Sequence, residues 1–312
     1  MKRIASGLDN LIVSNFIQVK GAKLGLIANE ASISSDFSHV CDLLHAHADL
    51  KKLFAPEHGF RGELQDMATI EDTVDAKTKL PIISLYGTSE KSLAPTKEAL
   101  EDLDMIIVDL QDIGTRYYTY VQSLGFIMQI AKECDTKVMV LDRPNPINGA
   151  NVEGALLTKK CRSFCGYAPV PNRHGMTIGE LALLMNKGFG EGENAIPQIG
   201  CELEVIPLLS WKREMYFEET ELPWVLPSPN MPTMETAVVY PGACLFEATQ
   251  VSEARGTTRP FELLGAPYID SEAWIDETFK QDIDLRGATL RSAYFQPTFQ
   301  KHAKEFCSGV QI

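Results

Sequence analysis

The stretch that decides the fold is "MIIVDLQDIGTRYYTYVQSLGFIMQIAKECDTKVMVLDR" (residues 105–143), because it holds a strand pattern, a helix pattern and a second strand pattern in turn. Residues 105–111 and 137–143 are short runs rich in apolar side chains, as in strands covered on both faces. Residues 115–134 carry apolar side chains at helical spacing. One stripe of this helix consists of Tyr117, Tyr120, Val121, Leu124 and Met128. The stretch therefore predicts a parallel βαβ unit.

The same alternation continues on both sides of this unit. Further strands are expected at residues 23–29, 50–56, 81–87 and 201–209, and further helices at residues 94–103 and 174–190. Strands that alternate with helices predict an α/β fold with a doubly wound, mostly parallel sheet.

Polar residues stand where each expected strand ends. They are Asn29 and Glu30, then Glu57 and His58, then Gln111 and Asp112, and finally Asp142, Arg143 and Asn145. In open α/β sheets the ligand binds outside the carboxyl ends of the strands, near a switch point in strand order. We therefore expect these side chains to converge on one edge of the sheet.

The composition changes after residue 210. Residues 221–267 are dense in Pro, Gly, Ser and Thr, and one helix near 271–281 and one strand near 288–295 follow. These features predict either an irregular lobe or a second domain whose loops fold back toward the first.

Charge and hydropathy exclude several classes of protein. The chain has 312 residues and a formal net charge of -13, which argues against a nucleic-acid partner. No apolar run reaches the roughly 18 residues of a membrane helix, so no membrane insertion is expected. The N-terminus contains no signal-peptide pattern, and the seven cysteines are odd in number and scattered. We expect a cytoplasmic protein as the sequence is written, and a periplasmic or secreted one if a leader was removed.

Cofactor and metal motifs are missing from the sequence. It contains neither G-x-G-x-x-G after the first strand nor G-x-x-x-x-G-K-[ST], and no G-x-S-x-G nucleophile elbow. Cys161 and Cys165 are four residues apart, but no second Cys or His pair close by completes a zinc site. We expect neither a cofactor nor a metal.

Two glutamates are the candidates for acid–base chemistry. Glu57 follows Pro56 at the end of a strand and is either a solvated turn residue or a general acid or nucleophile, with His58 or Arg61 tuning its pKa. Glu153 lies between Val152 and Gly154, where an apolar surround is expected to raise its pKa. Pairing a carboxyl of raised pKa with an ionised carboxylate is how glycosidases work.

Other polar residues have structural alternatives. Thr177 and Glu180 form a capping box, which explains Glu180 without catalysis. Asp142 beside Arg143 is best interpreted as a structural ion pair, whereas His174 is either a loop residue near the site or an ordinary turn residue.

The tyrosine run and a late loop offer ligand contacts. Tyr117 and Tyr120 lie on the apolar stripe and are expected to pack, Tyr118 lies off it, and Arg116 could meet an anionic substrate. The late loop is either a solvated loop or a carboxylate-binding one. Its polar residues are Glu247, Gln250, Ser252, Glu253, Arg255, Thr257, Thr258 and Arg259.

Seven blocks in order closely resemble the NamZ-type exo-β-N-acetylmuramidases, a bacterial glycoside hydrolase family long catalogued as a domain of unknown function. The blocks are "FAPEHGFRGE", "DLQDIGTRYYTYV", "VLDRPNPING…VEG", "HGMTIGELA", "PWVLPSPNMPT", "YPGACLFEATQVSEARGTTRPFELLGAP" and "CSGVQ". The resemblance implies release of N-acetylmuramic acid from non-reducing ends of peptidoglycan fragments. It also implies a Rossmann-like catalytic domain at 1–210 joined to a smaller C-terminal α+β auxiliary domain at 211–312, with a site in the cleft between them. The family's acidic pair falls on Glu57 and Glu153.

The resemblance also defines an expected substrate-binding set. N-acetylmuramic acid carries a lactyl carboxylate, for which Arg61, Arg116, Arg143, Arg255 and Arg259 are the candidates. The other expected substrate-binding residues are His58, Gln111, Asp112, Tyr118, Asn145, His174, Asn230 and Glu253. A carboxylate separation of about 5–5.5 Å would indicate retention and about 6.5–9.5 Å inversion.

The sequence departs from the family pattern at two places. It has Ala254 where relatives usually carry Gly, and "EATQ" where they carry "EGTN". It also stops at "CSGVQI", whereas the family typically continues, so truncation of the auxiliary domain is one interpretation. The alternative function is a non-catalytic protein that binds muropeptides or amino sugars.

Overall fold

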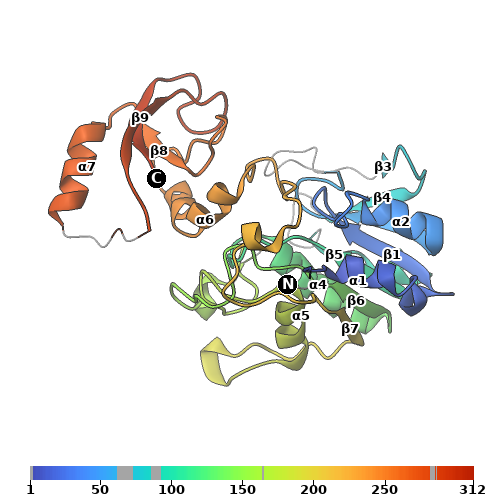
Figure 1. Ribbon diagram of the computed structural model, residues 1–312. Helices are drawn as coiled ribbons and strands as arrows, with labels where there is room; N and C mark the ends of the chain where they lie inside the picture. Colours follow the sequence, from blue (N-terminus) through green and yellow to red (C-terminus); the bar gives the residue numbers. More distant parts are fainter. Residues whose placement is uncertain (1–2, 62–72, 86–92, 164, 282–284, 286) are drawn as a thin grey trace. The chain divides into compact units, whose positions relative to one another are not determined.

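The computed structural model describes residues 3–61, 73–85, 93–163, 165–281, 285 and 287–312 (Figure 1). The chain divides into two compact units, Met1–Pro229 and Asn230–Ile312. The first unit is an α/β domain, and the second is built around a small antiparallel sheet. Among the described residues, no helix has both the length and the apolarity needed to cross a membrane.

The first unit contains a seven-stranded sheet with a doubly wound order. The strands are β1 (Lys23–Ala28), β2 (Asp49–Ala55), β3 (Thr73–Val74), β4 (Pro81–Ser84), β5 (Met105–Asp109), β6 (Lys137–Leu141) and β7 (Leu203–Ile206). Their order is β3-β4-β2-β1-β5-β6-β7, and every pair is parallel except β3 with β4. The chain moves outward from β1 through β2 and β4, then returns to β5 on the other side of β1. The switch point therefore lies between β1 and β5, and the expected Rossmann-like fold is confirmed.

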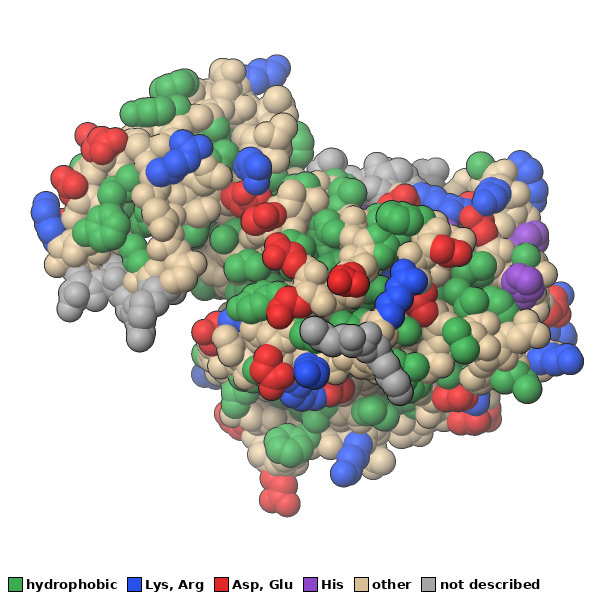
Figure 2. All heavy atoms as spheres, in the orientation of Figure 1, with side chains coloured by type: hydrophobic (Ala, Val, Ile, Leu, Met, Phe, Trp, Pro, Cys, Tyr) green, Lys and Arg blue, Asp and Glu red, His purple; other side chains and the backbone are tan. Residues whose placement is uncertain are grey.

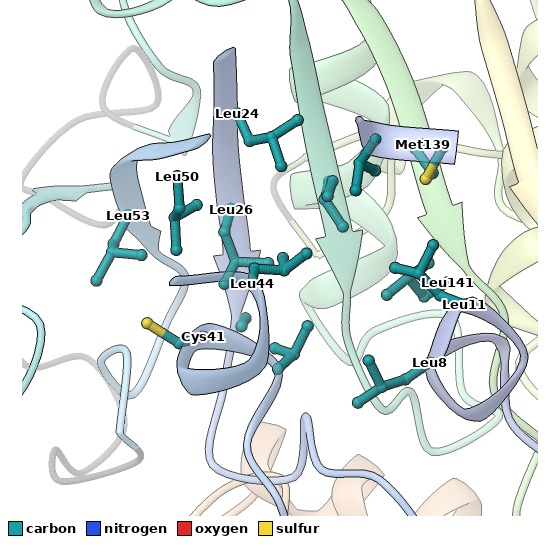
Figure 3. Packing of buried hydrophobic residues seen from close by; sticks show 14 of the residues in the cluster. Leu8, Leu11, Leu24, Leu26, Cys41, Leu44, Leu50, Leu53, Met139 and Leu141 are labelled. Carbon is teal, nitrogen blue, oxygen red and sulfur yellow. The ribbon is translucent and has the colours of Figure 1, made fainter. Parts of the chain in front are cut away.

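Helices cover both faces of this sheet. The helices are α1 (Gly7–Val13), α2 (Val40–His47), α3 (Lys97–Leu100), α4 (Tyr120–Glu133) and α5 (Ile178–Lys187). On one face, Leu8 and Leu11 of α1 and Leu44 of α2 are fully buried in one cluster with the strands (Figure 3). Alternate strand residues point to the other face, where α4 and α5 contact β6 and each other.

The boundaries of the expected elements changed where tertiary contacts intervened. The expected helix at 115–134 begins only at Tyr120, because Thr115 forms a β-bridge with Arg173 and the Arg116 N–H donates to the Asn172 carbonyl. The six expected strands of the large sheet end one to three residues earlier than expected, at Ala28, Ala55, Ser84, Asp109, Leu141 and Ile206. Residues 86 and 87 of the expected strand 81–87 lie outside the described residues.

Residues 211–229 belong to the first compact unit. The Gly149 N–H donates to the Arg213 carbonyl at 2.6 Å, and the Phe217 N–H donates to the Pro146 carbonyl at 3.0 Å. This Pro-rich segment is therefore tied to the loop that follows β6.

The second unit has a three-stranded antiparallel sheet in the order β8-β10-β9. Its elements are α6 (Met234–Ala243), β8 (Leu263–Ala266), α7 (Ser271–Lys280), β9 (Arg291–Phe295) and β10 (Cys307–Gln311). Helix α7 contacts β9 and β10, which completes a small α+β unit.

On the face shown in Figure 2, the described acidic and basic side chains are interspersed rather than gathered into one basic patch.

Asp142 joins the end of β6 to the start of α5. Its Oδ1 accepts from the Gly179 N–H at 2.8 Å, and its Oδ2 accepts from the Thr177 hydroxyl at 3.0 Å. Thr177 and Glu180 form the expected capping box. The expected ion pair of Asp142 with Arg143 is wrong, because the Arg143 guanidinium turns to Asp109 instead. Burial raises the pKa of the Asp142 carboxyl to about 6.

The raised pKa of Asp142 predicts that ionising this carboxyl group lowers the free energy of unfolding as pH rises. Between the ordinary aspartate pKa of 3.8 and the folded value of about 6, the folded state binds more protons than the unfolded state, so stability falls as pH rises. Relative to Asp142→Asn, the wild-type free energy of unfolding should fall by on the order of 2–3 kcal/mol between pH 4 and pH 7. Urea titrations at several pH values measure this difference, and a difference that does not vary with pH contradicts the account.

Candidate active site

The carboxyl edge of the sheet gathers buried polar side chains from four neighbouring strands. Asn29 follows β1, Glu57 follows β2, Asp112 follows β5 and Arg143 follows β6, and all four are buried. The Asn29 amide donates to the Pro227 carbonyl at 3.2 Å, which fixes the late segment of the first unit over this edge. The expected convergence of the strand ends is therefore present within this unit.

Glu57 lies in a tight turn and is only 8% exposed. The Gly59 N–H donates to the Pro56 carbonyl at 3.2 Å, and His58 has a φ of 74°, so the chain reverses directly after the strand. The Thr119 hydroxyl donates to Glu57 Oε2 at 2.5 Å. Thr119 is the residue directly before α4, so the start of the long helix supplies the hydroxyl that orients this carboxyl group.

Two buried tyrosines stand beside Glu57. The rings of Tyr118 and Tyr120 pack edge to face with centroids 4.9 Å apart, and the Tyr120 hydroxyl donates to the Pro227 carbonyl at 2.6 Å. Burial raises the pKa of both phenols, and the nearby Glu57 charge acts in the same direction. Both therefore remain neutral hydrogen-bonding groups, and Tyr120, expected only to pack, also tethers the late segment.

Asp112 and His174 form a buried pair. Asp112 Oδ2 accepts from the Gly114 N–H at 2.7 Å and lies 3.2 Å from His174 Nε2. His174 Nδ1 accepts from the Met176 N–H at 3.2 Å. Neither His174 Nε2 nor Asp112 Oδ1 has a hydrogen-bond partner among the described residues, although Nε2 lies close to the other carboxylate oxygen. The His174 backbone N–H donates to the Gly114 carbonyl at 3.3 Å, which joins the two loops.

Glu153 is the opposite of Glu57 in its surroundings. Its side chain is 65% exposed, and Arg173 Nη1 lies 3.0 Å from its Oε2. Val152 beside it is also exposed, so the expected apolar surround is wrong. Sequence reasoning missed Arg173, which is itself mostly buried. Its position directly before His174 in the "RHG" run was the only signal available.

The backbone of Arg173 links the two glutamates. It forms β-bridges with Glu153 on one side and with Thr115 on the other. Thr115 begins the short segment that leads to Thr119, the hydroxyl donor to Glu57. One stretch of chain therefore supports both carboxylates, although the two lie about a hundred residues apart in sequence.

Several expected ligand residues of the first unit hold loops together. Gln111 Nε2 donates to the Pro144 carbonyl at 3.0 Å, and Asn145 Nδ2 donates to the Met176 carbonyl at 3.0 Å. Arg61 Nη2 lies 3.1 Å from Asp75 Oδ1. Arg143 pairs with Asp109 and lines a cavity of about 10 Å³, which has room for about one water molecule.

Expected site residues of the second unit pair with one another or with neighbours in that unit. Arg255 lies 2.6 Å from Glu247, Arg259 lies 2.8 Å from Glu262, and Glu253 lies 3.0 Å from Lys301. Asn230, at the start of this unit, is buried. Among the described residues, no group of three or more His, Cys, Asp or Glu side chains is arranged to hold a metal ion.

Comparison with known proteins supports one family. The models of the N-terminal and C-terminal domains of exo-β-N-acetylmuramidase NamZ match residues 24–235 and 238–312. The peptidoglycan β-N-acetylmuramidase NamZ of Bacillus subtilis (strain 168) is 45% identical over 312 residues, which cover 99% of this chain and 72% of the relative.

Two crystal structures of DUF1343-family proteins from Bacteroides fragilis NCTC 9343 share the fold. One has a TM-score of 0.87 at 33% identity, and the match covers 100% of this chain and 77% of the solved chain. The other has a TM-score of 0.76 at 32% identity, and the match covers 99% of this chain and 76% of the solved chain. Given both domain models and a relative matched over 99% of this chain, the chain belongs to the NamZ exo-β-N-acetylmuramidase family.

Proposed function

We propose that this protein is an exo-β-N-acetylmuramidase that releases N-acetylmuramic acid from the non-reducing end of peptidoglycan fragments, with Glu57 and Glu153 as its acidic pair. Family membership supports the reaction. The observation that supports the pair is the common support of both carboxylates by the Thr115–Arg173 bridge.

The contrast between the two environments suggests a division of roles. Glycosidases place the proton donor in the more enclosed setting and the ionised carboxylate in a more polar, solvated one. Glu57 is buried beneath the Thr119 hydroxyl, whereas Glu153 is exposed and paired with a guanidinium. We assign the general acid to Glu57 and the nucleophile or base to Glu153.

The role assignment predicts different responses to the leaving group. In Glu57→Gln, cleavage of N-acetylmuramyl-N-acetylglucosamine should fall by about 10²–10⁴, the range of a general acid, while a dinitrophenyl glycoside that needs no protonation is still cleaved. In Glu153→Gln, cleavage of both substrates should be lost. Initial rates on the two substrates measure this, with a dinitrophenyl N-acetylglucosaminide as specificity control.

Two results would count against these proposals. An equal fall in the cleavage of both substrates in Glu57→Gln, with full activity in Glu153→Gln, would contradict the roles assigned to the two glutamates. Tight binding of the disaccharide without turnover by the wild type would favour the alternative, a protein that only binds muropeptides or amino sugars.

The Thr119 hydroxyl provides a second test. Thr119→Val removes the donor to Glu57 Oε2 while keeping the shape of the side chain, and kcat on the disaccharide should fall about tenfold because the carboxyl group loses its fixed orientation. Thr119→Ser keeps a hydroxyl and should retain most of the rate. Steady-state kinetics compare the two variants, and equal kcat values would show that this hydrogen bond does not matter.

A further inference from the structure

Arg116 differs from the other arginines that were expected to meet the substrate carboxylate. Each of the others has an acidic partner: Asp75 for Arg61, Asp109 for Arg143, Glu247 for Arg255 and Glu262 for Arg259. Among the described residues, no acidic side chain lies within ion-pair distance of Arg116, which is only 9% exposed.

The contacts of Arg116 use only part of its guanidinium group. Nη1 donates to the Ala155 carbonyl at 2.8 Å and to the Val170 carbonyl at 2.5 Å. These two bonds fix the position of the group but leave its charge without a counter-charge among the described residues. Nε and Nη2 have no hydrogen-bond partner in the part of the chain that the structure describes.

A buried cation without an anion is costly, so its retention calls for an explanation. Burial lowers the pKa of Arg116, and the groups that act in the opposite direction are Tyr117 and Cys161, not carboxylates. An arginine fixed in this way presents its remaining N–H groups to a planar anion such as a carboxylate.

Arg116 is also placed beside the candidate catalytic loop. Ala155, whose carbonyl it binds, is two residues beyond Glu153. The Arg116 N–H donates to the Asn172 carbonyl at 2.9 Å, next to the arginine that pairs with Glu153. The cation and the catalytic carboxylate therefore share the same small framework of paired backbone.

We propose that Arg116 is the residue that binds the lactyl carboxylate of N-acetylmuramic acid and so distinguishes this sugar from N-acetylglucosamine. The proposal rests on the proposed function, because that function supplies the substrate. The carboxylate provides the missing counter-charge, and the two carbonyl bonds hold the guanidinium ready for it.

The test combines a change in the protein with a change in the ligand. Calorimetry measures the Kd of free N-acetylmuramic acid and of its neutral lactyl methyl ester, for the wild type and Arg116→Gln. The wild type should bind the acid about 100-fold more tightly than the ester. In Arg116→Gln, the ratio of the Kd of the ester to the Kd of the acid should approach one. The glutamine amide still donates to a carbonyl, and thermal unfolding confirms that the variant folds.

Two further variants sharpen the comparison. Arg116→Lys keeps the charge without the planar group and should retain about a tenfold preference for the acid. Arg162→Gln removes an exposed arginine whose Nη2 donates to the Ala195 carbonyl, and its ratio of affinities for acid and ester should equal that of the wild type. The ratio of kcat/KM for the 4-nitrophenyl glycosides of the acid and of the ester should follow the same pattern.

The outcomes separate this proposal from the proposed function. A wild type that binds acid and ester equally, or a folded Arg116→Gln that keeps the full preference, overturns the role of Arg116. Binding that depends on the lactyl charge and on Arg116 without any turnover supports Arg116 and overturns the enzymatic proposal instead.

Discussion

The buried ion pair of Arg143 with Asp109 is the interaction on which the functional edge of the sheet depends. Asp109, the last residue of β5, is fully buried, and its two oxygens accept from Arg143 Nε at 2.5 Å and Nη2 at 2.8 Å. Nη2 also reaches the Ile33 carbonyl beyond β1 at 3.0 Å. One side chain thus ties the ends of three adjacent strands. Removing either partner would leave a buried charge unpaired, at a cost of about 3–5 kcal/mol.

The polar groups near this edge divide into those that hold loops and those that remain for a ligand. Gln111 and Asn145 have their hydrogen bonds directed into the protein and therefore act as scaffolding, whereas the buried His174 Nε2 has no hydrogen-bond partner among the described residues. Glu153 is exposed, and Arg116 lacks a counter-charge in the part of the chain that the structure describes. Under the proposed function, a glycoside of a sugar acid supplies what this remainder lacks, namely an anomeric carbon for Glu153 and an anion to pair with a buried cation.

Sequence predicted six of the seven strands of the large sheet because their apolar runs indicate buried strands, and it predicted the capping box of α5 because both partners are three residues apart. It missed the strands β3, β8 and β10, the short helices α1 and α2, and the helix α6, which contains Pro241. It also assigned Asp142 to Arg143 by adjacency, whereas the true partner is Asp109, 34 residues away. Such pairings depend on strand order, which local sequence patterns do not encode. The pairing of Arg173 with Glu153 could not be predicted for the same reason.

The central claim is that Glu57 and Glu153 face one glycosidic bond. A crystal structure of Glu57→Gln with N-acetylmuramyl-N-acetylglucosamine tests it most directly. The account predicts that the glycosidic oxygen lies within hydrogen-bonding distance of the side-chain amide of residue 57. It also predicts that Glu153 contacts either the anomeric carbon or a water molecule beside that carbon. A disaccharide bound with its scissile bond away from either side chain would contradict the claim.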